Sequence, residues 1–222
     1  MAFSVQTLNF LFENRLHDSR DWYNEHKDDY RAYVAAPFSA LIEAFAPTMA
    51  EIDAEIVCNP KKFSRLWRDA RFAKGDSLFR DNVWCSFGRK KEPFEMVPEF
   101  YFELSPNGFS YGCGYYAAGT KTMEAMRGMI LSGDKTAKAA LSAYAAQRVF
   151  TLGGELYKKN RYPDAEEVAA TWLNRRSVYL FAGGKDFDLL FSEALAEKIA
   201  ADFRAIAPVY RMFRAAEARS KE

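Results

Sequence analysis

Apolar residues recur at helical spacing over the first 52 positions of the chain. They are separated by three or four residues, which is the period of one face of an α-helix. The first stripe consists of Val5, Leu8, Leu11, Phe12 and Leu16. The sequence therefore predicts an amphipathic first helix, and we expect its apolar stripe to be buried.

Two further helices are predicted before residue 53. Asp18 or Ser19 is a suitable N-cap for the second helix. Pro37 fits the first turn of the third. Pro47 falls inside the third apolar stripe, and we expect it to kink or shorten that helix.

Between residues 82 and 115 the period changes to two, which is typical of strands. Residues 82–87 alternate, and so do 99–104 and 109–115. The turn sequence Ser105-Pro106-Asn107-Gly108 separates the last two runs and predicts a β-hairpin. Gly112 and Gly114 lie on one face of its second strand, where a missing side chain lets another backbone or a ligand approach closely.

The C-terminal half is mostly helical. Residues 121–147 predict one or two helices with a break at Gly133-Asp134, and an apolar stripe with Pro208 in it predicts a long, kinked final helix. Residues 177–181 are a strand candidate. Helices that bracket a run of antiparallel strands indicate an α+β fold. We predict a single domain over residues 1–222, with a central, mainly antiparallel sheet and helices from both chain ends packed on it.

Charge, aromatic residues and glycine crowd together between Arg65 and Asn82. Residues 61–82 contain seven basic and three acidic side chains, which gives a local charge of +4 in a chain whose net charge is only +1. The arginine fork suits carboxylate or phosphate groups better than the point charge of lysine does. Asp69, between Arg68 and Arg71, could orient these arginines around an anion.

The same cluster has an equally physical structural interpretation. Arginine and aspartate side chains this close together often pair with each other and with loop backbone, and then they hold a loop rather than a ligand. Arg80, Asp81 and Asn82 are also suitable turn and cap residues. The sequence therefore leaves two hypotheses: a small-anion site, or a structural clamp in a scaffold or protein-interaction module.

Composition excludes several classes of protein. The chain is 49% hydrophobic and 27% charged, with a pI near 7.6, which argues against a general nucleic-acid binder. Its three cysteines show no CxxC or zinc spacing, and we expect them to be reduced. No apolar run reaches the ~18 residues that span a membrane, and the first ten residues lack a signal-peptide pattern. We expect a cytoplasmic protein with no membrane partner, and the sequence does not predict an oligomeric state.

Motifs for particular chemistries are sparse. His17 and His26 have no Ser or Cys partner motif nearby, and there is no phosphate-binding P-loop, dinucleotide fingerprint or HExxH sequence. Three aspartates, Asp69, Asp76 and Asp81, could ligate Mg²⁺, but the surrounding positive charge opposes a divalent cation. We predict no metal and no cofactor.

An ordered set of motifs resembles the DUF2461 family of conserved hypothetical proteins. The resemblance covers nearly the whole chain, and its most specific part is the R-x-x-R-D-x-R-F motif. In order, the matching positions are Phe10-Leu11, Asp21-Trp22-Tyr23, Lys27, Tyr30, Pro37, Arg65-x-x-Arg68-Asp69-x-Arg71-Phe72, Phe79-Arg80-x-Asn82, Tyr101-x-x-Leu104-Ser105-Pro106-x-Gly108, Gly112-x-Gly114-Tyr115 and Arg127-x-x-Ile130.

The resemblance implies a single α+β domain and no established activity. Where the family commonly reads S-K-D-K-S-P-Y-K-T-N, this chain has Gly75-Asp76 in place of the acidic-basic pair and Leu78 in place of proline. Arg80 replaces a lysine. If those family residues carry chemistry, these departures predict that this chain has lost or altered it.

These observations define a candidate ligand site rather than a catalytic one. Asp69 is the one acid placed to act, and neighbouring arginines should keep it ionised, which favours an orienting role. We predict that a small phosphate- or carboxylate-bearing ligand binds the arginine-rich stretch, with aromatic side chains as an apolar wall. The candidate ligand-binding residues are Arg65, Arg68, Asp69, Arg71, Arg80, Asn82, Trp22, Tyr115 and Arg127.

Overall fold

The computed structural model describes residues 2–69, 77–91 and 96–221. Its centre is a five-stranded, wholly antiparallel sheet with the strand order β1-β2-β3-β5-β4. The strands are β1 (Val83–Phe87), β2 (Glu99–Ser105), β3 (Gly108–Gly114), β4 (Thr151–Gly153) and β5 (Tyr179–Gly184). The α+β fold class and the hairpin predicted from the sequence are confirmed, and Ser105 pairs with Gly108 at its turn.

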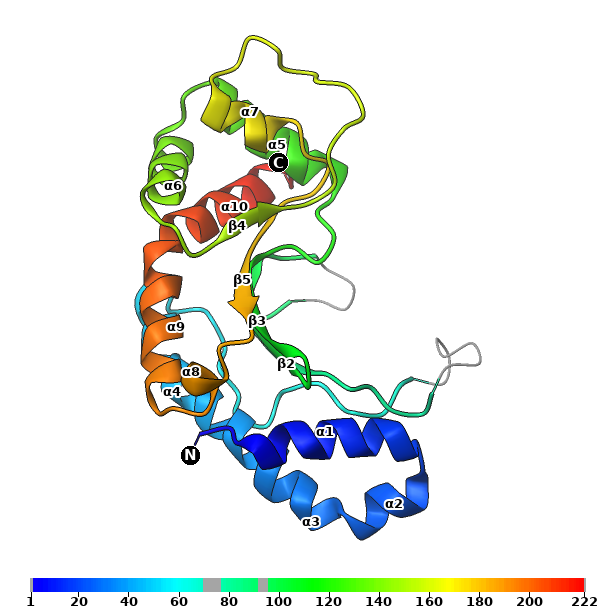
Figure 1. Cartoon of the computed structure of the whole chain (residues 1–222). Helices are drawn as coiled ribbons and strands as arrows, with labels where there is room; N and C mark the ends of the chain where they lie inside the picture. Colours follow the sequence, from blue (N-terminus) through cyan, green and yellow to red (C-terminus); the bar gives the residue numbers. More distant parts are fainter. Residues whose placement is uncertain (1, 70–76, 92–95, 222) are drawn as a thin grey trace.

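Helices from both ends of the chain lie along one side of this sheet and at its two ends (Figure 1). The N-terminal helical elements are α1 (Val5–His17), α2 (Arg20–Glu25), α3 (Lys27–Asp29), the π-helix η1 (Tyr30–Ala35) and α4 (Ala36–Ile52). The later helices are α5 (Thr120–Leu131), α6 (Lys135–Ala146), α7 (Glu167–Leu173), α8 (Phe187–Leu190), α9 (Ala194–Ala205) and α10 (Ala207–Arg219).

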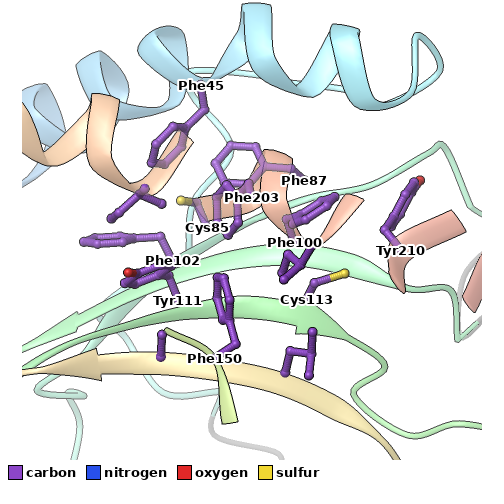
Figure 2. Packing of buried hydrophobic residues seen from close by; sticks show 14 of the residues in the cluster. Phe45, Cys85, Phe87, Phe100, Phe102, Tyr111, Cys113, Phe150, Phe203 and Tyr210 are labelled. Carbon is purple, nitrogen blue, oxygen red and sulfur yellow. The ribbon is translucent and has the colours of Figure 1, made fainter. Parts of the chain in front are cut away.

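One face of the sheet carries the core. Alternate side chains of β1, β2 and β3 are buried, and they meet aromatic side chains from α4, α9 and α10, as Figure 2 shows. Phe45 of α4, for example, packs edge-on against Phe87 and Phe203, with ring centroids 5.5 and 5.6 Å apart. The opposite face of the sheet is only partly covered, because Tyr179 and Phe181 are both exposed there.

Of the helix interruptions predicted at Pro47, Gly133-Asp134 and Pro208, the last two occur as breaks between helices. Pro208 stands in the first turn of α10, so the predicted kinked tail is two helices with a break at Ile206. Pro47 does not shorten α4, which continues to Ile52. Gly133-Asp134 separates α5 from α6 as predicted, and the Asp134 carboxylate caps α6.

The buried face of α1 differs from the face that the sequence predicts. Leu11 of the predicted stripe is buried and Leu8 is partly buried against the core, but Val5, Phe12 and Leu16 are exposed. The helix also buries Thr7, Phe10 and Asn14. The face that packs on the rest of the protein is therefore rotated from the face that apolar spacing alone selects. Among the described residues, no helix has the length and apolar character needed to cross a membrane.

Candidate functional site

The described part of the arginine-rich stretch forms a two-stranded arm. We use "arm" for residues 64–69 and 77–82, which run antiparallel to each other beside the first strand (Figure 1). Arg68 N–H donates to the Leu78 carbonyl at 2.9 Å, and Arg80 N–H donates to the Leu66 carbonyl at 2.8 Å. Arg71 lies outside the described residues, between these two halves.

Aromatic rings anchor the base of the arm to the second helix. Trp67 and Phe79 face each other across the arm with ring centroids 4.3 Å apart. Tyr23 of α2 packs on both of them, at 5.5 and 5.3 Å. Burial of these rings fixes the direction in which the arm leaves the fold.

Asp18 holds the arm from a second side. It ends α1 with a left-handed backbone, φ 46°, and its carboxylate accepts the N–H groups of Leu78 and Phe79 at 3.0 Å each. Ser19, the other predicted cap residue, begins α2. The pairing of Asp18 with residues sixty positions away has no signal in the sequence.

Two arginine side chains of the arm, those of Arg68 and Arg80, contact backbone oxygens. Arg68 Nε donates to the Phe79 carbonyl at 3.2 Å, across the arm. Arg80 Nη1 lies 3.5 Å from the carbonyl oxygen of Arg65. These contacts join the two halves of the arm, as the clamp hypothesis expects.

Two of the candidate ligand-binding residues, Arg80 and Asn82, also connect the arm to the sheet. The Arg80 guanidinium lies 4.8 Å from the centroid of the Trp84 ring, within the range of a cation–π contact. Asn82 donates from its side-chain amide to the Glu103 carboxylate at 2.9 Å. Asp69, next to the segment outside the described residues, is partly buried.

Trp22 and Tyr115, the predicted aromatic wall, lie in different surroundings. Two imidazole rings stack on Trp22, His26 at 4.1 Å and His17 at 5.1 Å between ring centroids. Tyr115 is buried, and its hydroxyl donates to the Phe213 carbonyl of α10 at 2.5 Å. Burial raises the pKa of Tyr115 well above its ordinary value.

Arg127, the last candidate, is buried away from the arm. Only 6% of the residue is exposed. Its Nε donates to the Leu173 carbonyl at 3.1 Å, and Nη2 donates to the Arg175 carbonyl at 2.6 Å and to the Tyr157 hydroxyl at 3.0 Å. Within the described part of the chain, no carboxylate pairs with this guanidinium.

Arg127 lines a pocket of about 980 Å³, which we call the basic pocket. Five cationic side chains and a single carboxylate, Glu155, line it, a formal balance of +4. Glu155 pairs with Arg176 at 2.9 Å. The pocket is lined by residues 116–118, Thr120, Met123, Arg127, residues 155–161, Arg176 and Ser177.

Tyr157 organises two of the guanidinium groups in this pocket. The Arg161 guanidinium carbon lies 3.7 Å from the centroid of the Tyr157 ring, and that of Arg127 lies 5.3 Å from it. A ring face attracts cations, so one tyrosine offsets part of the repulsion between two arginines.

Backbone hydrogen bonds fix the loop that carries these residues. Tyr157 N–H donates to the Asn174 carbonyl at 2.9 Å, and Arg161 N–H donates to the Asn174 side chain at 2.8 Å. Arg176 N–H donates to the Glu155 carbonyl at 2.6 Å. The basic loop is therefore held in one position on the segment between α7 and β5.

The opposite wall of the pocket comes from the first eight residues of α5. Thr120, Met123 and Arg127 share one face of this helix. Its N-cap residue, Gly119, provides no side-chain cap, and no acidic residue occupies the first turn. The N-terminal end of a helix carries a partial positive charge, which adds to the cationic character of the pocket.

The sequence predicts Arg127 as a binding residue but does not predict that the loop 155–161 lies beside it. The Lys158-Lys159 pair is visible in the sequence as a basic loop, thirty positions after Arg127. Only the tertiary structure brings the loop and the helix together. Among the described residues, no group of three His, Cys, Asp or Glu side chains could hold a metal ion, and Asp76 lies outside them.

A protein-family model matches most of the chain. The family model described as "Conserved hypothetical protein (DUF2461)" matches residues 6–212. No curated protein matches the chain.

Proposed function

This chain belongs to the DUF2461 family, and we propose that it binds a small ligand bearing phosphate or carboxylate in the basic pocket. The observation that carries the proposal is the buried Arg127 guanidinium, which has no carboxylate partner among the described residues. The proposed binding groups are Arg127, Arg161, Arg176 and the Lys158-Lys159 pair.

A buried charge without a counter-charge is unfavourable, because it loses hydration. Two carbonyl oxygens and one phenol offset part of this cost for Arg127, but none of them neutralises it. A bound anion would supply the missing negative charge. The printed hydrogen bonds of Arg127 use Nε and Nη2, so Nη1 is the nitrogen left to donate to the anion.

The arm supports a second role, that of a structural clamp. Arg68 and Arg80 bond to arm carbonyls, and Asp18 accepts two arm N–H groups. A ligand site on the arm, built from Arg65, Arg68, Asp69, Arg71 and Arg80, remains a prediction. We assign no reaction to either place.

Thermal unfolding in inorganic phosphate tests the proposal with three variants that all change one arginine to lysine. Arg127→Lys alters the basic pocket, Arg80→Lys alters the arm, and Arg211→Lys on the exposed side of α10 is the matched control. Lysine keeps the charge but loses the fork. We expect phosphate to raise the melting temperature of the wild type, Arg80→Lys and Arg211→Lys proteins, and to leave Arg127→Lys unchanged.

A shift lost in Arg80→Lys and kept in Arg127→Lys would move the anion site to the arm. No shift for the wild type with phosphate or with carboxylates would overturn the proposal. Hydrogen exchange on the wild type covers the case in which Arg127→Lys folds poorly. Phosphate should slow exchange in residues 155–161 and 116–123 and leave residues 77–82 unaffected.

A further inference from the structure

We infer that the ligand of the basic pocket carries two phosphoryl groups, as a diphosphate or a bisphosphate does. The inference rests on the proposed function and adds the ligand class. Three features of the pocket support it: the amount of charge, the division of that charge between buried and exposed positions, and the volume.

The charge of the pocket exceeds what one phosphate can neutralise. A phosphate monoester carries about −1.5 to −2 at pH 7. The lining side chains have a formal balance of +4, and the first turn of α5 adds a further partial positive charge. Two phosphoryl groups match this charge, whereas one would leave roughly half of it uncompensated.

The cations occupy two kinds of position. Arg127 is buried, and its guanidinium is fixed by three hydrogen bonds before any ligand arrives. Lys158, Lys159 and Arg161 are exposed on the loop that forms the other wall. We assign one phosphoryl group to Arg127, and the second to the exposed cations of the loop.

Tyr157 connects these two positions. Its hydroxyl accepts a hydrogen bond from Arg127. The Arg161 guanidinium lies over its ring, with the guanidinium carbon 3.7 Å from the ring centroid. The guanidinium groups are thereby preorganised, so a ligand need not order both of them on binding. The pocket volume, about 980 Å³, lies at the upper end of the ~300–1,000 Å³ range of small-molecule sites. It therefore has room for a ligand much larger than one phosphate.

Isothermal titration calorimetry at fixed pH and ionic strength tests this inference. The probes are inorganic phosphate, inorganic diphosphate, methylenediphosphonate, which does not hydrolyse, and succinate as a dicarboxylate. We expect both diphosphoryl probes to bind at least ten-fold more tightly than phosphate, and succinate to bind no better than phosphate.

A pair of double variants tests the assignment of the second phosphoryl group. Lys158→Ala/Lys159→Ala removes two loop cations, and Lys135→Ala/Lys185→Ala removes two exposed lysines that do not line the pocket. The loop variant should lose at least ten-fold in diphosphate affinity and less than three-fold in phosphate affinity. The control variant should change neither by more than two-fold.

The results distinguish a wrong ligand class from the absence of an anion site. Phosphate and diphosphate affinities within three-fold of each other would overturn the inference and leave the anion site standing. Tighter binding of succinate than of diphosphate would also overturn it. Binding of none of the four probes would overturn the proposed function itself.

Discussion

At the scale of single residues, two glycines show how the surroundings determine whether an added methyl group raises or lowers stability. A Cβ atom at Gly112 in β3 would lie 1.9 Å from the Leu180 carbonyl oxygen and 2.9 Å from a ring carbon of Tyr101. At Gly128 in α5, a Cβ atom would meet nothing within 4 Å. The close neighbour that the sequence predicted for Gly112 is thus a paired strand and a ring lying against the sheet.

The substitutions Gly112→Ala and Gly128→Ala should therefore have opposite signs. We expect Gly112→Ala to lower the free energy of unfolding by at least about 2 kcal/mol, because a backbone atom must move. Gly128→Ala should raise it by about 0.5–1 kcal/mol, because alanine restricts the unfolded chain and favours helix. Urea unfolding of both variants measures the difference, and a stable Gly112→Ala protein would contradict this account of the sheet.

At the scale of elements, short polar contacts connect segments that are distant in sequence. Asp18 joins the end of α1 to the arm. Asp53, just after α4, accepts from Arg89 at 2.7 Å and from the Tyr210 hydroxyl of α10 at 2.9 Å. Both carboxylates lie where an element ends, so each one fixes the direction of the chain there.

Removal of the Asp18 carboxylate should loosen the arm. A hydrogen bond to a charged acceptor contributes about 1.5–3 kcal/mol, and Asp18→Ala loses two. Because these two bonds are exposed or only partly buried, we expect that variant to lose less than the full sum, about 2–4 kcal/mol of stability. Asp18→Asn should lose less, because asparagine keeps one acceptor and tolerates positive φ. Hydrogen exchange at the Leu78 and Phe79 amides measures the effect directly. Asp28→Ala, in exposed α3, is the control, and unchanged exchange in Asp18→Ala would refute the contact.

Asp53 predicts a dependence of stability on pH. Burial raises the pKa of its carboxyl, but hydrogen bonds from Arg89, the Glu55 N–H and Tyr210 outweigh burial and lower the pKa below its ordinary value. The contribution of Asp53 is therefore fully present above about pH 4 and is lost as the pH falls through the folded-state pKa. Asp53→Asn should be less stable than wild type at pH 7, and the gap should narrow below about pH 4. Chemical unfolding across this range measures it, and a gap independent of pH would contradict the prediction.

At the scale of the whole molecule, the two charged regions lie at different places on the fold. In Figure 1 the arm leaves the fold beside α1 and α2, whereas α5 and α7, next to the basic pocket, lie at the other end of the sheet. The arm is tied into the fold by backbone hydrogen bonds and aromatic packing. The pocket holds cations without an equal number of carboxylates. This separation is the reason to expect ligand binding at the pocket and support at the arm.

Ligand binding should therefore stabilise the whole protein. Inorganic diphosphate at about 100 times its dissociation constant should add about 2.7 kcal/mol, which raises the melting temperature by roughly 5–10 °C for a chain of this length. The shift should shrink as sodium chloride is added, because salt screens the exposed cations of the loop. A shift that grows with salt would indicate an apolar ligand contact instead.

Local patterns along the sequence predict most of the elements and the class of fold. The β2–β3 hairpin, the break before α6 and the sites of proline at helix starts follow from local backbone preferences, which need no distant partner. The family follows from ordered motifs along the chain. The buried face of α1 depends on long-range packing, because Phe10 and Phe12 are equally apolar and only Phe10 is buried. The contacts of the arginines also depend on the tertiary structure. Arg68 donates to a carbonyl of its own arm, whereas Arg127 contacts Tyr157, thirty residues later in the chain. Charge placement depends on long-range contacts, and spacing along one chain does not encode those contacts.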